Sequence, residues 1–219
     1  MKEIEAKFLD IDINEIRKKI KLNNGKKIHK MMLYRRYVFH LENGYIRVRQ
    51  ENKKTTMTVK TYSNDSKFAD EHEIVIGSSL DEARDFLLAL GYKLKSYHET
   101  LREKWSLGEC HEIAIDTIPG IPSYIELECK NEKAIKKIAK LLDLDMSKAE
   151  YEAYWKQYVD YYGMKKEDAT IVPSLTFKNI DKELEKYIKK NHNLVKEVKK
   201  IHLELIKKNK ILSFSSAKK

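Results

Sequence analysis

Charged and apolar residues alternate with a period of two along most extended stretches of this chain, and the charged positions repeatedly share one face. In the opening residues, Glu3, Glu5 and Lys7 point to one side of a strand, and the apolar residues between them point to the other. Residues 45–49 repeat this pattern with two arginines, and residues 124–128 repeat it with two glutamates. A single stretch of this kind would be the solvated face of an ordinary strand. Its repetition predicts that the charged faces meet.

Turn and cap signals divide the chain into eight expected strands and several helices. The strands are expected at 1–9, 31–41, 45–50, 55–62, 69–76, 97–105, 109–117 and 123–130. Helices are expected from Asp12 or Asn14 to Leu22, from Ser79 or Asp81 to Leu90, over 132–142 and over about 149–162. The second helix would bury a stripe made of Leu80, Ala83, Phe86, Leu87 and Leu90.

A hairpin is expected where Asn43 and Gly44 separate the second strand from the third, because Asn-Gly is typical of tight hairpin turns. A two-residue turn at this position would place Arg36 on the same face as the arginines of the third strand. A shift of one residue would place Arg35 there instead.

We expect an α+β fold in which the eight antiparallel strands form a closed barrel, with helices packed outside it and a helical C-terminal extension. Closure would collect the charged faces in one lumen. An open sheet with a solvated face is the alternative, but it gives no reason to repeat paired acids and arginines at alternate positions. The expected lumen acids are Glu3, Glu5, Glu71, Glu73, Asp116, Glu126 and Glu128; the bases are Lys7, Arg47, Arg49, Lys60, Arg102 and Lys104.

The length of 219 residues suits one large domain, expected at 1–162, followed by a basic extension at 163–219. Neither a run of eighteen apolar residues nor a signal peptide is visible, so we expect a cytoplasmic protein without a membrane partner. Cys110 and Cys129 lack metal-ligand spacing, and in a reducing compartment they are expected to be free thiols.

The basic charge is concentrated in the extension, where residues 161–219 contain fifteen lysines, no arginine and seven acidic residues. Asn179 is expected to cap a long helix with a break near residues 191–193, and His192 and His202 are expected at the surface. Two interpretations remain open. The helices either pack on the barrel with solvated lysines, or they form a basic arm for RNA or an acidic partner.

Arginine is the minority cation, with seven arginines against 37 lysines, and five of the seven fall in expected strands. The planar guanidinium group binds carboxylates and phosphates through two parallel hydrogen bonds, which an ammonium group cannot do. The strand arginines are therefore candidate anion-binding residues.

These residues resemble the CYTH family, also called the triphosphate tunnel metalloenzymes. The family includes class IV adenylyl cyclases, thiamine triphosphatases, inorganic triphosphatases and some RNA 5′-triphosphatases. The resemblance covers residues 1 to about 160 and is carried, in the family's order, by Glu3, Glu5, Lys7, Tyr45, Arg47, Arg49, Lys60, Glu71, Glu73, Arg102, Lys104, Asp116, Glu126 and Glu128.

The resemblance implies a tunnel that binds a triphosphate through its bases and Mg²⁺ or Mn²⁺ through its acids. The implied phosphate-binding residues are Lys7, Arg47, Arg49, Lys60, Arg102 and Lys104. The basic pair of the second strand, which departs from the family's cyclases, adds Arg36 as a further candidate. The implied metal ligands are Glu3, Glu5, Asp116, Glu126 and Glu128, with Glu5, Lys7 and Glu128 as catalytic residues. Glu71 and Glu73 would hold a second metal ion or orient the basic residues.

The implied function is metal-dependent hydrolysis of a triphosphate substrate: inorganic triphosphate, thiamine triphosphate, a nucleotide or an RNA 5′ end. The second hypothesis is a class IV adenylyl cyclase that makes cyclic AMP and pyrophosphate from ATP. Arg35 and Arg36 disfavour it, because cyclases of the family tend to have a Gln-x-Asp-x-Tyr stretch in this strand. The third hypothesis is a module that binds polyphosphate or RNA ends without chemistry.

Overall fold

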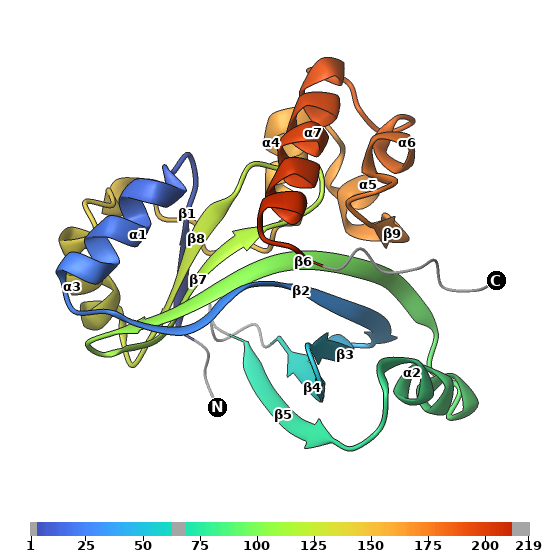
Figure 1. The fold of residues 1–219 in the computed structure, drawn as a ribbon. Coiled ribbons are helices and arrows are strands. Elements are labelled where there is room, and N and C mark those ends of the chain that lie inside the picture. The colour runs from blue at the N-terminus through green and yellow to red at the C-terminus, as the bar shows by residue number, and fades with distance from the viewer. Residues whose placement is uncertain (1–3, 63–68, 212–219) are drawn as a thin grey trace.

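The computed structural model describes residues 4–62 and 69–211 and contains one sheet with helices around it (Figure 1). The strands are β1 (Glu5–Phe8), β2 (Lys26–Leu41), β3 (Gly44–Glu51), β4 (Lys54–Thr61), β5 (Asp70–Ile76), β6 (Leu94–Leu107), β7 (Cys110–Thr117), β8 (Tyr124–Cys129) and β9 (Ser174–Leu175). The α-helices are α1 (Ile13–Leu22), α2 (Leu80–Ala89), α3 (Glu132–Leu141), α4 (Trp155–Tyr162), α5 (Lys166–Ile171), α6 (Ile180–Leu184) and α7 (His192–Lys208), and a 3₁₀ turn covers Met146–Lys148. Among these described helices, none has the length and apolarity needed to span a membrane.

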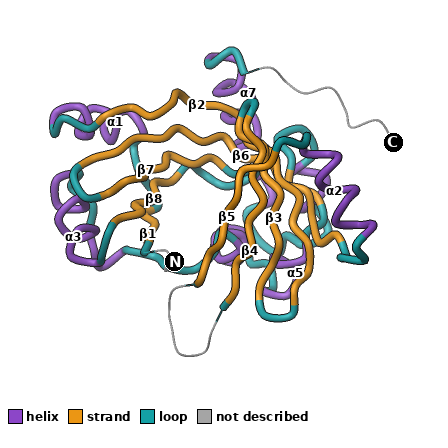
Figure 2. Tube along the Cα trace, turned by 90° about the horizontal axis from the view of Figure 1, so that it is seen from below, coloured by secondary structure: helices purple, strands orange, loops and turns teal. Residues whose placement is uncertain are grey.

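Eight strands form one antiparallel sheet in the order β1-β8-β7-β6-β2-β3-β4-β5, and the two-residue β9 pairs in parallel with β6. The sheet is curled, so that the β1-β8-β7 part faces the β3-β4-β5 part (Figure 2). The predicted α+β class and antiparallel strands are confirmed. The predicted closed barrel is wrong, because β1 and β5 are the two ends of the strand order and do not pair in the part of the chain that the structure describes.

The outer edge of β1 is occupied by another segment. Lys7 and Glu150 form an isolated antiparallel bridge with two backbone hydrogen bonds of 2.8 and 2.9 Å. A strand has one backbone partner on each side, so Glu150 takes the position that β5 would need for closure. The extended conformation around Glu150 also explains why the helix predicted over 149–162 begins only at Trp155.

The long strands β2 and β6 join the two halves of the sheet. They pair with each other through most of their 16 and 14 residues. β7 then pairs with the end of β6, whereas β3 pairs with the end of β2. The β7-β8-β1 branch and the β3-β4-β5 branch of the sheet therefore start from one central pair of strands.

The β2–β3 hairpin turns at Glu42 and Asn43, one residue before the predicted Asn43-Gly44 turn, and Leu41 pairs with Gly44. The pairing is thereby shifted by two residues, so Arg36 stays on the face of the β3 arginines. Arg36 lies directly opposite Arg49, and Arg35 lies opposite Gln50 on the other face. Gly44 is required by its close approach to β4, because a Cβ atom there would lie 1.9 Å from the carbonyl oxygen of Lys60. This contact fixes the spacing of β3 and β4 next to the site.

Apolar clusters cover the outer face of the sheet. The largest joins β1, β6, β7 and β8 to α1 and α3, and a separate cluster holds α2 against β2 and β3. Asp12 and Ser79 cap α1 and α2, as predicted. In α2, however, Phe86 and Leu90 are both 60% exposed. The buried stripe is limited to Leu80, Ala83 and Leu87, because the other two residues lie to one side of it.

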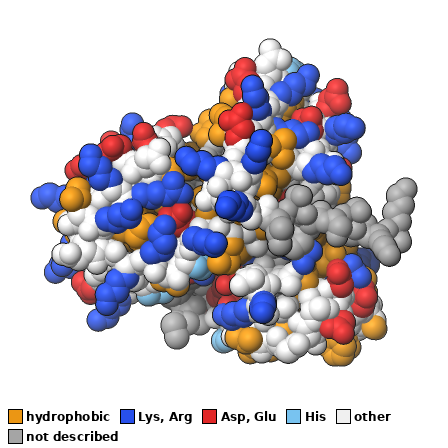
Figure 3. Space-filling view, viewed as in Figure 1, with side chains coloured by type: hydrophobic (Ala, Val, Ile, Leu, Met, Phe, Trp, Pro, Cys, Tyr) orange, Lys and Arg blue, Asp and Glu red, His pale blue; other side chains and the backbone are white. Residues whose placement is uncertain are grey.

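The C-terminal residues pack on the sheet. Helices α4 to α7 share a core with the β7–β8 connection, and α7 exposes lysines on the face seen in Figure 3. The helix predicted from Asn179 is interrupted next to the predicted break near residues 191–193, but the interruption begins earlier: α6 ends at Leu184, and Asn191 adopts a left-handed conformation before α7. His192 is exposed as predicted, but His202 is 2% exposed and packs edge-on against Phe177.

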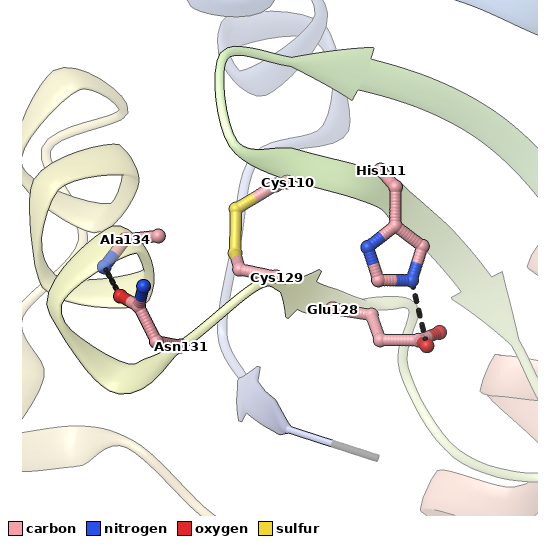
Figure 4. Close-up of a disulfide and its surroundings, with 6 residues drawn as sticks. All are labelled: Cys110, His111, Glu128, Cys129, Asn131 and Ala134. Carbon is pink, nitrogen blue, oxygen red and sulfur yellow. Dashed lines mark hydrogen bonds and ion pairs between the residues drawn. A yellow bond between two sulfur atoms is a disulfide. The ribbon is translucent and has the colours of Figure 1, made fainter. Parts of the chain in front are cut away.

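Cys110 and Cys129 are joined by a disulfide, so the prediction of free thiols is wrong for this structure (Figure 4). The two residues are directly opposed in the β7–β8 register. Their separation of 19 residues carries no metal or disulfide signature, and only the hairpin register brings the two sulfur atoms together.

Candidate functional site

The charged strand faces line the inner, concave side of the sheet. Directly opposed residues of an antiparallel pair share a face, and the registers place the predicted site residues together on this side. The residues placed there are Glu5, Lys7, Arg36, Arg47, Arg49, Lys60, Glu71, Glu73, Arg102, Lys104, Asp116, Glu126 and Glu128. Glu3, the remaining predicted ligand, lies outside the described residues.

The two walls are close enough to interact electrostatically. Lys60 on β4 lowers the pKa of Glu126 on β8, and Arg49 on β3 lowers that of Glu112 on β7. Between the walls lies Tyr34, whose ring centroid is 5.6 Å from the guanidinium carbon of Arg49 and 5.9 Å from that of Arg102. The concave side is therefore one continuous charged site.

On the β3-β4-β5 wall, the glutamates of β5 hold the cations. Arg47 lies 3.1 Å from Glu71 and 3.3 Å from Glu73, and the Thr58 hydroxyl donates to Glu73 at 2.8 Å. Burial would raise the pKa of Glu73, but Arg49, Thr58 and Arg47 together lower it. Of the two roles predicted for Glu71 and Glu73, these contacts favour the orientation of basic residues.

Arg49 is the most constrained cation of this wall. It is 9% exposed and pairs with Glu51 at 2.7 Å and with Glu73 at 3.4 Å. Burial and the neighbouring Arg47 lower its pKa. Its Nε atom and the hydroxyls of Thr56 and Thr100 are buried and have no hydrogen-bond partner among residues 4–62 and 69–211. Buried donors of this kind are costly unless a ligand or water satisfies them.

Arg36 lies directly opposite Arg49 across the β2–β3 pair. Like charges in this position destabilise a sheet. In the described residues, Arg36 has no carboxylate within ion-pair distance, whereas the other inner cations each have at least one. An anion between the two guanidinium groups would relieve the repulsion.

On the opposite wall, Lys7 bridges two carboxylates. Its Nζ atom lies 2.9 Å from Glu126 and 3.1 Å from Glu5. Burial would lower the pKa of Lys7, but Glu126 and Glu5 outweigh this effect and raise it. Burial would likewise raise the pKa of Glu126, but Lys7 and Arg102 bring it down to about 2. Both groups are charged at neutral pH.

Arg102 lies among the acids of β7 and β8. It binds Asp116 at 2.5 and 2.7 Å, Glu112 at 2.8 Å and Glu126 at 3.2 Å. Lys104 binds Glu112 at 2.8 Å. A guanidinium group thus occupies the space between carboxylates that were assigned to a metal ion.

The carboxylates have the chemistry that a hard divalent cation needs, and three of them lie in a row across neighbouring strands. Glu5 is directly opposite Glu128, and Glu128 is directly opposite Glu112, which makes a row of three acids across β1, β8 and β7. Their Cβ atoms are within about 4.5–5.5 Å of each other in such pairs, and oxygen ligands suit Mg²⁺ and Mn²⁺. As the side chains lie, Glu5 and Glu112 pair with lysines and Glu128 accepts from His111 (Figure 4). In the described residues no three ligating groups yet converge, so side-chain rotation is needed.

Sequence reasoning missed three residues of this site: Tyr34, Glu51 and Glu112. Each lies two or four positions from a predicted residue on the same strand face, so strict alternation could have found it. Glu112 contacts two of the predicted cations, Arg102 and Lys104.

The fold and the site define an α+β protein whose single curled antiparallel sheet has a charged concave face. The model of the CYTH domain matches residues 1–154 of the sequence. The chain therefore belongs to the CYTH family, and the resemblance noted in the sequence is confirmed.

Solved structures show the same fold. The PH1012 protein of Pyrococcus horikoshii is 20% identical, with a TM-score of 0.62 over 71% of this chain and 98% of that one. A conserved hypothetical protein of Pyrococcus furiosus is 21% identical, with a TM-score of 0.60 over 71% and 99%. A putative adenylate cyclase of Vibrio parahaemolyticus is 16% identical, with a TM-score of 0.58 over 71% and 97%. A search of the curated proteins finds no match.

Proposed function

We propose that this protein is a divalent-metal-dependent phosphohydrolase that acts on a triphosphate-bearing substrate. The opposition of Arg36 and Arg49, next to buried donors without an acceptor, carries the proposal. A polyphosphate offers several anionic oxygens in a short chain, which is what two adjacent guanidinium groups bind best. Membership of the CYTH family supports this substrate class.

The β3-β4-β5 wall would bind the phosphate chain. Arg47, Arg49 and Lys60 are held in place by Glu71 and Glu73, so their ordering is achieved before the substrate arrives. Phosphate oxygens would replace part of these carboxylate contacts. The unpartnered Arg49 Nε atom and the Thr56 hydroxyl would supply further donors.

The opposite wall, made of β1, β8 and β7, would hold the metal ion through Glu5, Asp116, Glu126 and Glu128. When bound, Mg²⁺ or Mn²⁺ supplies the positive charge that neutralises phosphate oxygens during hydrolysis. Lys7 stays protonated between Glu5 and Glu126, so it would orient these carboxylates and donate hydrogen bonds to the terminal phosphate.

The proposal is tested by phosphate release with Mg²⁺ or Mn²⁺ from tripolyphosphate, thiamine triphosphate, nucleoside triphosphates and triphosphate-ended RNA. We expect release from at least one substrate and a loss of roughly 100-fold or more in Glu5→Gln, because a metal ligand is removed. Glu42→Gln, in the exposed β2–β3 turn, is the control and should match the wild type. Calorimetric titration should show that Glu5→Gln binds Mn²⁺ more weakly than the wild type does, whereas Glu42→Gln binds it equally well.

The products separate the alternatives. One structural relative is described as a putative adenylate cyclase, so the nucleotide products must be identified. Cyclic AMP and pyrophosphate from ATP would establish cyclase chemistry in place of hydrolysis. Tight binding of tripolyphosphate without any turnover would establish a binding module.

A further inference from the structure

Arg36 is held by a neutral aromatic residue and not by an acid. Its guanidinium carbon lies 5.4 Å from the ring centroid of Tyr154. Burial raises the pKa of the Tyr154 hydroxyl, and the nearby charge of Arg36 acts against this increase. A carboxylate in this position would cancel the charge of Arg36. A phenol fixes the side chain and leaves the positive charge available to an anion.

The Tyr154 hydroxyl is itself fixed by a hydrogen-bond chain of defined direction. It lies 2.9 Å from Nδ1 of His98, and the backbone of Val172 acts to raise the pKa of the imidazole, as a carbonyl oxygen beside a ring N–H does. We therefore place the proton of His98 on Nε2, so that Nδ1 accepts from Tyr154. The oxygen of Tyr154 is then free to accept from Arg36.

His98 is suited to remain neutral in its contact with Tyr154. It is 4% exposed, and Tyr154 packs against its ring edge-to-face at 5.5 Å. Burial, together with Arg36 and Lys95, lowers its pKa well below the ordinary value. A protonated imidazole would lose the acceptor at Nδ1 and release Tyr154.

The series of contacts that runs from Arg36 through Tyr154 and His98 ends in the C-terminal extension. Val172 is outside residues 1–154, the part that matches the family model. The next residues are fixed to β6, since the Tyr97 amide donates to the carbonyl of Pro173 at 2.9 Å and Leu175 pairs with His98. The extension is thereby connected to the inner face of the sheet through β6.

We propose that Tyr154 and His98 are positioning residues through which the C-terminal extension directs Arg36 at the substrate's phosphate chain. This inference rests on the proposed function. It makes the extension a part of the site, although none of its side chains needs to touch the substrate.

The test is Tyr154→Phe, which removes the hydroxyl and keeps the ring. We expect KM for the triphosphate substrate to rise roughly 3- to 10-fold, the size of one lost hydrogen bond, with kcat within about twofold. Arg36→Ala should weaken binding more, and adding Tyr154→Phe to it should have no further effect. Tyr158→Phe is the matched control: this residue lies one turn along α4, and its hydroxyl donates to Pro119 at 2.7 Å. It should leave KM unchanged even where the melting temperature falls.

Equal KM values for Tyr154→Phe and the wild type, or additive effects of Tyr154→Phe and Arg36→Ala, would overturn the proposal. A second readout needs no turnover. Nitrogen NMR of His98 should show the neutral Nε2–H tautomer, and calorimetry without metal should show weaker tripolyphosphate binding by Tyr154→Phe than by Tyr158→Phe. If the wild type hydrolyses no triphosphate, the proposed function fails, and these two measurements decide the positioning role separately. An Nδ1–H or protonated His98 would refute it.

Discussion

His202 should make the stability of the fold depend on pH. The imidazole is 2% exposed, lies edge-on to Phe177 and has no hydrogen-bond partner at Nδ1. Burial lowers its pKa from 6.5 to about 4, although a hydrogen bond with the Ile121 backbone acts in the opposite direction. The protonated form is therefore strongly disfavoured in the folded state.

The sign and the size of the effect follow from proton linkage. Between pH 6.5 and pH 4 the unfolded chain binds a proton at His202 and the folded chain does not, so acidification favours unfolding. The stability that the neutral His202 contributes is fully present above pH 6.5, decreases as the pH falls and does not change further below pH 4. Across the whole interval it amounts to about 3 kcal/mol, of which about 2 kcal/mol is lost by pH 5.

Urea unfolding of the wild type and His202→Gln at pH 7.5 and pH 5 measures this contribution. The wild type should lose about 2 kcal/mol more than the variant on acidification, because the glutamine cannot be protonated. His192→Gln, on the exposed start of α7, is the control and should behave like the wild type. The reasoning is refuted if the stability difference between wild type and His202→Gln is the same at both pH values.

Two further changes test the sheet itself. Gly44→Ala should destabilise the fold by about 1–3 kcal/mol, because the new Cβ atom would overlap the β4 backbone; Gly77→Ala, with no atom within 4 Å of the new Cβ, is the control, and equal melting temperatures of the two variants would contradict the assigned contact. Reduction of the Cys110–Cys129 disulfide should lower the free energy of unfolding by about 3 kcal/mol, since it opens a loop of roughly 20 residues. Urea titrations with and without dithiothreitol measure this loss, and a double Cys→Ser variant that still responds to the reductant would show that another group is responsible.

The alternation of side chains along strands was predictable from the sequence, because a period of two is a local property of the backbone. It placed Arg47 and Arg49 on one face of β3 but left Arg35 and Arg36 as alternatives on β2, and only the register of the folded hairpin pairs Arg36 with Arg49. The caps of α1 and α2 were predictable for the same reason, since a capping side chain bonds backbone amides two or three residues away.

What the sequence could not provide are relations between distant segments. Closure of the sheet depends on which segment takes the outer edge of β1, and Glu150 takes it. The burial of His202 and the disulfide depend on how the C-terminal helices and the β7–β8 hairpin come together. The contacts of Arg102 with Asp116 and Glu126 likewise appear only when β6, β7 and β8 are paired.

The position of β1 has a consequence for the order of events during synthesis. β1 is translated long before its partners, β8 and Glu150. At about 5–20 residues per second, it waits roughly 7 to 30 s on the ribosome before both partners exist. During this time the apolar cluster that Ala6 and Phe8 join in the finished protein is incomplete. Glu5 and Lys7 are thus made well before the residues that hold them in their final positions.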